Sequence, residues 1–244
     1  VGLARDINIF NNCHHIGNVT VKNGIAGGIT ARNGILYNCY SSGNITSITD
    51  ANESNSFGYA SAGGISGDGS EVYNCYSTGR IYTNGYAYCY SGGIAGNAYL
   101  ISNCYSNSVV ITKSTNKAFT GGIAGKCPKV NNCVSLNDSI ISISLFNNNF
   151  AGNIVGIYKE NEYDTYQFSS NYAKTTNKIF TGISINDKNV VSNYSDYNRF
   201  GSPLTTDILS LLNNYVNQNS VINSIKLRSW VVSTVNNNGL PIFN

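Results

Sequence analysis

Acidic side chains are the groups in this sequence that could do acid–base chemistry on a sugar. A glycoside hydrolase needs two carboxyl groups at a set separation, and a lyase needs a base beside Ca²⁺ to acidify a sugar proton. The 12 acids of the 244-residue chain are Asp6, Asp50, Glu53, Asp68, Glu71, Asp138, Glu160, Glu162, Asp164, Asp187, Asp196 and Asp207. Their spacing shows no recurring pair of carboxylates, so the sequence predicts no catalytic residue and no enzyme.

One acidic segment keeps an enzymatic alternative open. Asp68 and Glu71 are close enough to share one turn, which we interpret as a solvated corner. The alternative is a carbohydrate-active enzyme of the polysaccharide lyase or hydrolase kind, with a substrate groove around Asp50 to Asp68. Loss of turnover in Asp68→Ala would establish that alternative.

Metal, phosphate and cofactor sites find little support in the residue spacing. Glu160, Glu162 and Asp164 offer hard oxygens to Ca²⁺ at alternate positions, but they lack the Asp and Gly pattern of a dedicated calcium loop. Cys13-His14-His15 has no second ligand pair at zinc-site spacing. Residues 121–126, GGIAGK, lack the spacing of a phosphate-binding loop. We therefore expect no metal-binding and no cofactor-binding residue, and no cofactor.

The segment 121–126 belongs instead to an internal repeat. A Gly-Gly-Ile block occurs four times, and each copy leads to an Asn-Cys pair. The second Gly and the Cys are 11 residues apart in every copy: Gly28 to Cys39, Gly64 to Cys75, Gly93 to Cys104 and Gly122 to Cys133. The blocks themselves lie 36, 29 and 29 residues apart, with the extra length near Asp50 to Gly58. Insertion at one place in a repeat is typical of a solenoid.

The segments between these blocks predict short parallel strands. They are rich in Ile, Val, Tyr and Thr, as in residues 79–83 and 109–112, and they show no helical period before Thr206. We therefore predict an all-β, right-handed parallel β-helix of about six or seven coils with strands of about three to five residues. Glycine pairs are expected at corners that need a positive φ or a close backbone approach. Ile29, Ile65, Ile94 and Ile123 should stack as an interior ladder.

The seven cysteines are expected to act mainly as small apolar side chains. Cys39, Cys75, Cys104 and Cys133 share one repeat position, so their Cα atoms should lie about 4.8 Å apart. Parallel Cβ vectors make disulfide geometry poor in such a column. One or two bridges, involving Cys89 or Cys127 outside the ladder, are the alternative.

The repeat resembles the GLUG motif. The matching strings are residues 92–96, GGIAG, with 101–106, ISNCYS, and residues 63–67, GGISG, with 72–79, VYNCYSTG. GLUG repeats occur in bacterial surface proteins and in non-catalytic regions of immunoglobulin A-cleaving metallopeptidases. The resemblance covers about residues 9–195 and implies a repeat architecture of the adhesin type. The H-E-x-x-H zinc motif of those metallopeptidases is absent from this sequence, so the resemblance carries over no activity.

The last 44 residues differ from the repeats, so we divide the chain into repeats, 1–200, and a C-terminal helix and strand cap, 201–244. Thr206-Asp207 is a helix start, and apolar residues follow at helical spacing up to Val216. Residues 230–232 and 239–243 are predicted terminal strands. We expect the helix to lie across an open end of the coils, where it would protect unpaired strand edges. The alternative is packing on a side face.

Composition favours binding over catalysis. Charged residues make up 11% of the chain and the net charge is +3, without a basic run that could neutralise a phosphate backbone, so nucleic acid is not an expected partner. No apolar stretch is long enough for membrane insertion. The 18 Tyr suit contacts with a host or matrix glycan or protein. We expect a non-catalytic structural or adhesive module, extracellular or on the cell surface, with self-association into filaments through residues 1–9 as one form.

Overall fold

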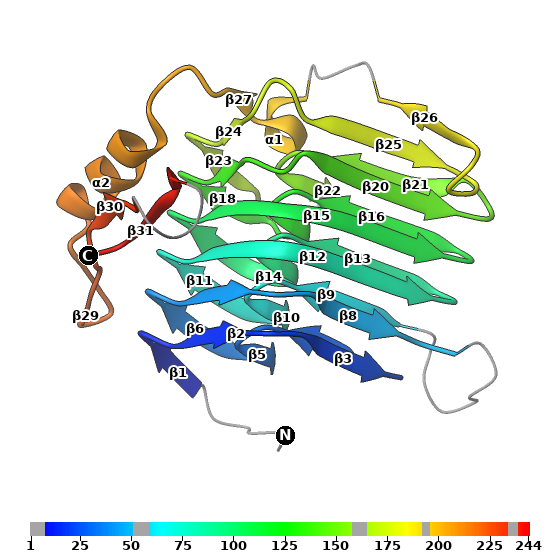
Figure 1. The fold of residues 1–244 in the computed structure, drawn as a ribbon, viewed down its shortest axis with the longest axis horizontal. Helices are drawn as coiled ribbons and strands as arrows, with labels where there is room; N and C mark the ends of the chain where they lie inside the picture. The colour runs from blue at the N-terminus through cyan, green and yellow to red at the C-terminus, as the bar shows by residue number, and fades with distance from the viewer. Residues whose placement is uncertain (1–7, 51–58, 158–164, 192–195, 234–238) are drawn as a thin grey trace.

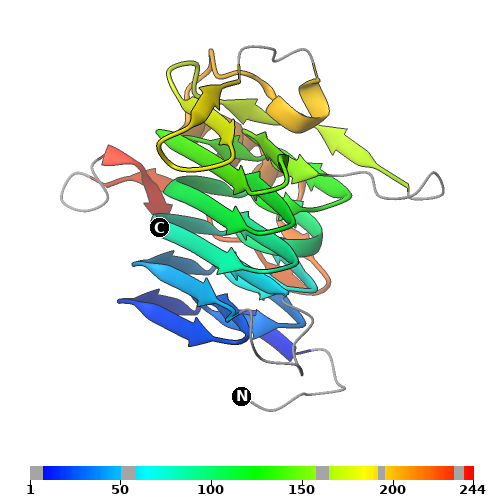
Figure 2. The same cartoon turned by 90° about the vertical axis from the view of Figure 1, so that its right-hand side faces the viewer.

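The computed structural model describes residues 8–50, 59–157, 165–191, 196–233 and 239–244. The chain is built almost entirely of β-strands, and nearly all of the strand pairs are parallel. Figure 1 shows the strands lying above one another, with the colour advancing from blue at β1 to yellow at β25 and β26. Figure 2 shows the same order from the side. The predicted parallel pairing of an all-β chain is confirmed.

Two large sheets and one small sheet contain most of the strands. The 10-stranded sheet contains β1 (Asn8–Asn11), β5 (Thr30–Arg32), β6 (Gly34–Tyr37), β10 (Ser66–Asp68), β11 (Ser70–Tyr73), β14 (Ala95–Ser102), β17 (Ala124–Lys126), β18 (Lys129–Asn131), β22 (Val155–Ile157) and β23 (Gln167–Ser169). The 12-stranded sheet contains β2 (His14–Ile16), β3 (Val19–Lys22), β7 (Tyr40–Ser42), β8 (Ile45–Ile48), β12 (Tyr76–Gly85), β15 (Tyr105–Ser114), β19 (Val134–Ser135), β20 (Ser139–Ser144), β24 (Tyr172–Ala173), β25 (Lys178–Gly182), β26 (Lys188–Val190) and β27 (Ser202–Pro203). The five-stranded sheet contains β4 (Ile25–Gly27), β9 (Ala60–Gly63), β13 (Tyr88–Gly92), β16 (Lys117–Gly121) and β21 (Asn148–Gly152).

The remaining elements are short and lie near the C-terminus. They are α1 (Tyr197–Phe200), α2 (Ile208–Gln218), the antiparallel pair β28 (Val221–Ile222) and β29 (Ile225–Lys226), and the antiparallel pair β30 (Trp230–Val232) and β31 (Pro241–Phe243). Within the described residues, no helix is long and apolar enough to cross a membrane. The helix α1 lies before Thr206, where the sequence showed no helical period, because a single turn is too short to produce one.

The repeats pair in the register that the sequence spacing predicts. The first Gly of each block aligns with the first Gly of the next, so that Gly27, Gly63, Gly92, Gly121 and Gly152 form one column. Some strands are longer than predicted, because β12 and β15 each run for 10 residues and pair along their whole length. In the preceding repeat the same segment is divided into β7 and β8.

The interior column of isoleucines is confirmed. Ile65, Ile94 and Ile123 have no exposed surface, and Ile154 of a degenerate repeat extends the column. Ile65, Ile94 and Ile123 each donate the backbone N–H to the carbonyl of the isoleucine in the next repeat, as Ile65 does to Ile94 at 2.8 Å. Ile29 is only half-buried. Since burial of one such side chain contributes about 1.5–3 kcal/mol, the column is a main source of stability.

The cysteine column is also confirmed, with all seven thiols free. The backbone N–H of Cys39 donates to the sulfur of Cys75 at 3.3 Å, and the N–H of Cys75 donates to the sulfur of Cys104 at 3.3 Å. Cys89 and Cys127 are buried and unbridged, which contradicts the disulfide alternative. A thiol therefore fits a position that is apolar on one side and faces a backbone N–H on the other.

Close approach, and not positive φ, explains the glycine pairs. A Cβ on Gly64 would lie 2.2 Å from the carbonyl oxygen of Gly93 and 2.5 Å from the side chain of Ser77. None of the pair glycines has a positive φ. The Ser of the N-C-Y-S string therefore lies against the second Gly of its own repeat. This contact explains why the distance in sequence between the Gly pair and the Asn-Cys pair is constant.

The predicted position of the C-terminal helix is wrong. Asp207 caps α2 as expected, because its side chain accepts from the backbone N–H of Ser210 at 2.9 Å. However, α2 lies beside the stacked strands and not across their end (Figure 1). Its buried residues Leu212 and Val216 share an apolar cluster with Tyr73 and other tyrosines of the repeats. We call residues 204–233 and 239–244 the C-terminal strap.

The C-terminal end of the stack is covered by other elements. Strand β26 pairs antiparallel with β25, and α1 contacts β22. The carbonyl of Arg199 accepts from the backbone N–H of Ile154 at 2.9 Å. Arg199 thus takes the place that the isoleucine of a further repeat would occupy. Phe200 packs on Ile140 and Ile179. These contacts use the edge groups that the strap helix was expected to protect.

Candidate binding groove

A column of stacked rings runs up the outer face of the 12-stranded sheet. His14 stacks on Tyr40 with ring centroids 5.1 Å apart, Tyr40 on Tyr76 at 5.0 Å, and Tyr76 on Tyr105 at 5.1 Å. The interplanar angles of these pairs are 8°, 5° and 1°. The parallel register of β2, β7, β12 and β15 places the four rings at one repeat position.

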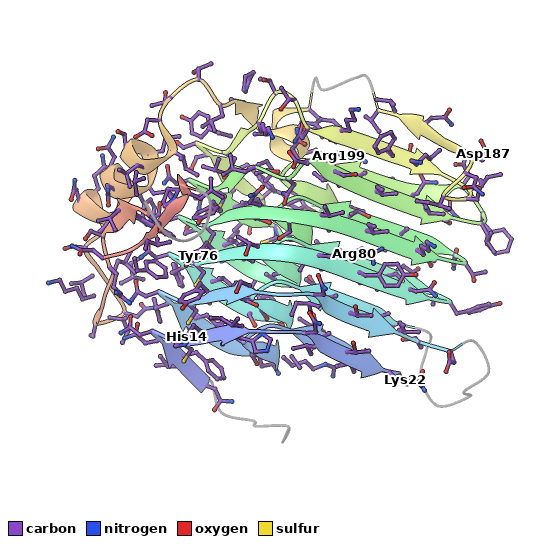
Figure 3. All side chains as sticks on the ribbon, in the orientation of Figure 1. His14, Lys22, Tyr76, Arg80, Asp187 and Arg199 are labelled. Carbon is purple, nitrogen blue, oxygen red and sulfur yellow. The ribbon has the colours of Figure 1, made fainter. Side chains whose placement is uncertain are left out.

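A second, more polar row lies beside the rings. Residues two positions along a strand point to the same face, so the row consists of Ile16, Ser42, Thr78 and Asn107. This row and the rings of His14, Tyr40 and Tyr76 line a groove of about 830 Å³. Its other wall is formed by Arg228, Ile242 and Phe243 of the strap. The groove therefore offers hydroxyl, amide and guanidinium groups beside aromatic rings. Figure 3 shows His14 and Tyr76 on this sheet.

The strap is held in place by an asparagine column that the sequence analysis missed. Asn38, Asn74, Asn103 and Asn132 have φ values of 53°, 54°, 54° and 51°, a left-handed conformation that Asn adopts more readily than most residues. Their side chains form a chain of hydrogen bonds, in which Asn74 donates to Asn38 at 2.8 Å and Asn103 donates to Asn74 at 2.7 Å. The repeated Asn before each Cys was the available signal.

The same asparagines bind the strap backbone. Asn38 donates to the carbonyl of Lys226 at 3.0 Å, and Asn74 donates to the carbonyl of Arg228 at 2.9 Å. The indole N–H of Trp230 donates to Oδ1 of Asn74 at 2.7 Å. Trp230 then packs on Phe243 with centroids 4.5 Å apart, which fixes the aromatic wall of the groove.

Tyr76 of the groove is neutral at physiological pH. Burial raises the pKa of Tyr76 to about 12, and the neighbouring Tyr40 adds to this shift. A neutral phenol both donates and accepts hydrogen bonds. Tyr40 is half-buried and Tyr105 is fully buried beneath the strap, so the accessible part of the column lies at its N-terminal end.

A basic cluster lies on the same face, farther along β12. The guanidinium of Arg80 lies 5.2 Å from the ring centroid of Tyr82, and the ammonium of Lys113 lies 5.9 Å from it. Two cations thus share one aromatic ring, an arrangement that the ring quadrupole stabilises. Arg80 is exposed, whereas Lys113 and Tyr82 are half-buried.

Asp68 is not the solvated corner that we predicted. It accepts from Nδ2 of Asn97 at 2.8 Å, and Nε of Arg32 lies 4.0 Å away, with the Asp68 side chain 22% exposed. Burial raises its pKa, and Asn97 and Arg32 partly oppose the shift. Glu71 accepts from the Tyr73 hydroxyl at 3.0 Å. The register of the repeats explains the difference, because it aligns Asp68 with Arg32.

The other candidate ligands do not gather. The part of the chain that the structure describes holds no group of three or more His, Cys, Asp or Glu side chains placed to bind a metal ion. His14 lies in the ring column, and the Cys13 sulfur lies 3.7 Å from the carbonyl of Asn11. The acids Glu160, Glu162 and Asp164, which lack the pattern of a calcium loop, lie outside the described residues, as do residues 51–58 of the insertion.

Comparison with known proteins gives one structural likeness. No family model matches the chain, and no curated protein matches it. A crystal structure of a "putative immunoglobulin A1 protease" from Bacteroides ovatus is similar, with a TM-score of 0.48 and 19% identity over 94% of this chain and 75% of that chain. We draw no argument from this likeness.

Proposed function

We propose that this protein is a non-catalytic structural and adhesive module of the GLUG-repeat type, extracellular or on the cell surface. Its repeats wind as a right-handed parallel β-helix, and the resulting rod displays a binding face. The in-register columns of Ile, Cys and Asn support this proposal, because a stack of like side chains is what a solenoid interior requires.

The observation that carries the adhesive role is the groove. Three repeats each place an aromatic side chain and a second side chain on the groove, a fourth adds Asn107, and the strap adds a fixed wall. Tyr and Trp supply large contact areas at low conformational cost, and the hydroxyl and amide groups of the second row supply hydrogen bonds. Such a surface suits a host or matrix glycan or a protein partner, bound without chemical conversion.

A binding screen with matched variants tests this role. The protein is applied to a glycan array and to cultured cells, and Tyr40→Ala is compared with Tyr99→Ala. Tyr40 lines the groove, whereas Tyr99 is 62% exposed on the 10-stranded sheet. We expect Tyr40→Ala alone to reduce binding, by about tenfold for one aromatic contact. Absence of any ligand in both assays would remove the adhesive proposal.

Self-association into filaments is a subsidiary form of the proposal. Strand β1 pairs with β6 and with no other described strand, and Ile9 and Ile16 at this end are 59% and 71% exposed. A second copy could pair with this edge. Sedimentation velocity over a range of concentrations should then show larger species. A single monomeric species at all concentrations would refute association.

Asp68 supports a second candidate, a carbohydrate-active enzyme. Its raised pKa would favour the protonated form that a general acid needs, and Arg32 lies beside it. Turnover of a polysaccharide panel that is lost in Asp68→Asn and retained in Glu71→Gln would establish this activity. Absence of turnover by the unmodified protein would dismiss it.

A further inference from the structure

The two large sheets differ in their acidic residues, because the 10-stranded sheet carries two acids beside Arg32, Lys126 and Lys129, whereas the 12-stranded sheet carries cations alone. The described strands of the 12-stranded sheet contain no Asp or Glu, but they contain Lys22, Arg80, Lys113, Lys178 and Lys188. The acids Asp68 and Glu71 both lie in the 10-stranded sheet. The middle of the 12-stranded sheet, around Arg80 and Lys113, is therefore positively charged, while Asp50, Asp138 and Asp187 lie next to the ends of its strands β8, β20 and β26.

Most of these cations are exposed on the part of the sheet beyond the groove. Lys22, Arg80 and Lys178 are exposed, and Lys113 is half-buried against Tyr82. Figure 3 shows His14, Lys22, Tyr76 and Arg80 on this sheet. Arg228 adds a further cation at the groove wall. An excess of Lys and Arg over Asp and Glu on one part of the surface attracts anions from solution and raises their local concentration.

We propose that this face binds an acidic glycan, a chain of sugars carrying carboxylate or sulfate groups. The inference rests on the adhesive function proposed above and specifies its ligand. Arg80 and Lys113 bind the anionic groups, and Ser42, Thr78 and Asn107 bind the sugar hydroxyls. The accessible ring of Tyr40 contacts the less polar parts of the sugars.

The dimensions of the face suit an extended chain. Tyr76 and Tyr82 are six residues apart on β12, which corresponds to about 20 Å at about 3.3 Å per residue. The groove and the basic cluster are thus the two ends of a strip as long as a short oligosaccharide. An anionic group at Arg80 and a sugar ring at Thr78 can be bound by the same molecule.

The neutral part of the strip favours a glycan over a nucleic acid. Polynucleotide binding sites combine closely spaced cations with open aromatic faces for base stacking. Here the rings of Tyr40 and Tyr76 stack on each other, so the faces that they share are not open to a nucleic-acid base. The hydroxyl and amide groups of the groove lie between Arg228 and the basic cluster of Arg80 and Lys113, where a polynucleotide would place further phosphates.

Direct binding measurements with four probes test the inference. The probes are polygalacturonate, which carries carboxylates, heparin, which carries sulfates, dextran, which is neutral, and single-stranded DNA. Dissociation constants are measured by titration calorimetry at low and at physiological salt. We expect at least one acidic glycan to bind, with affinity falling as salt rises, and dextran to bind at least about tenfold more weakly. The acidic probe that binds more tightly identifies the anionic group.

Charge-removing variants assign the binding to this face. Arg80→Gln with Lys113→Gln should weaken binding of the acidic glycan by about tenfold and reduce its salt dependence. Lys129→Gln is the matched control, because Lys129 lies on β18 of the other large sheet, and it should bind within about twofold of the unmodified protein. Thermal unfolding verifies that each variant is folded.

Each remaining outcome overturns the inference. Equal loss in Lys129→Gln, equal binding of dextran, or equally tight binding of DNA would show that this face does not select acidic sugars. If neither acidic probe binds while the array or the cells reveal a neutral glycan or a protein ligand, the inference fails and the adhesive function stands. If no assay detects any ligand, both fail.

Discussion

Replacing Asn74 tests whether the asparagine column joins the strap to the repeats. The Asn74 side chain is fully buried and makes four hydrogen bonds, with Asn38, Asn103, the Arg228 carbonyl and the indole of Trp230. Asn74→Ala leaves two buried donors unmet, on Trp230 and Asn103, at about 1–3 kcal/mol each. It also places a less tolerant residue at φ 54°, at about 1 kcal/mol.

The expected loss in the free energy of unfolding is therefore about 3–7 kcal/mol, a large part of the total of about 5–15 kcal/mol for a folded domain. Asn74→Gly relieves the backbone strain but makes none of the hydrogen bonds, so its loss should be smaller by about 1 kcal/mol. Asn84→Ala is the matched control on β12, where the side chain is exposed, and it should change stability by less than about 0.5 kcal/mol.

Urea denaturation provides the assay. Trp230 is the single tryptophan of the chain and lies in the strap, so its fluorescence reports strap detachment, while circular dichroism reports the sheets. We expect the fluorescence transition of Asn74→Ala to shift at least as far as the dichroism transition. A loss below about 1 kcal/mol, or a fluorescence midpoint that does not move, would refute the reasoning.

Three further predictions concern single residues. In the native protein, alkylation followed by mass spectrometry should label Cys13 before the six buried thiols. Its labelling should be slow at neutral pH, because burial raises the pKa of Cys13. Early labelling of several cysteines would contradict the buried column. Gly93→Ala should lower the free energy of unfolding by more than about 2 kcal/mol, because its Cβ would lie 2.2 Å from the carbonyl oxygen of Gly122. Gly34→Ala is the control and should be tolerated, because its Cβ would lie 3.0 Å from the movable ring of Phe10. Urea denaturation compares the two variants. Since burial raises the pKa of Asp68 in the folded state, its ionisation opposes folding as pH rises; Asp68→Asn should therefore gain melting temperature relative to the unmodified protein between acidic and neutral pH, and a constant difference would contradict the assignment.

Local sequence was a sufficient guide to the core because each repeat contacts mainly its neighbours. Equal spacing from Gly64 to Cys75 and from Gly93 to Cys104 fixes the pairing register, and the register determines which side chains stack. The same logic would have revealed the asparagine column, since Asn precedes each Cys of the ladder. Spacing places these asparagines in one column but does not give their hydrogen bonds, because a chain of side-chain hydrogen bonds depends on orientations that spacing does not specify.

The strap shows where local reasoning failed. Helical spacing from Ile208 to Val216 and the Asp207 cap predicted α2, but they contain no information on which surface the helix covers. The Asp68 environment failed for a related reason, because Arg32 and Asn97 belong to the preceding and following repeats. A residue that looks solvated in its own turn is half-buried once its neighbours are stacked.

The sequence alone determined the repeat, its register and the apolar identity of the interior, because these follow from a period and from which side chains avoid water. Only the tertiary structure decided that the strap lies along the side and that its Arg228 and Phe243 complete a groove with rings from separate repeats. Contacts between residues more than 150 positions apart, such as Asn74 with Trp230, arise from the fit of two surfaces that no local pattern encodes.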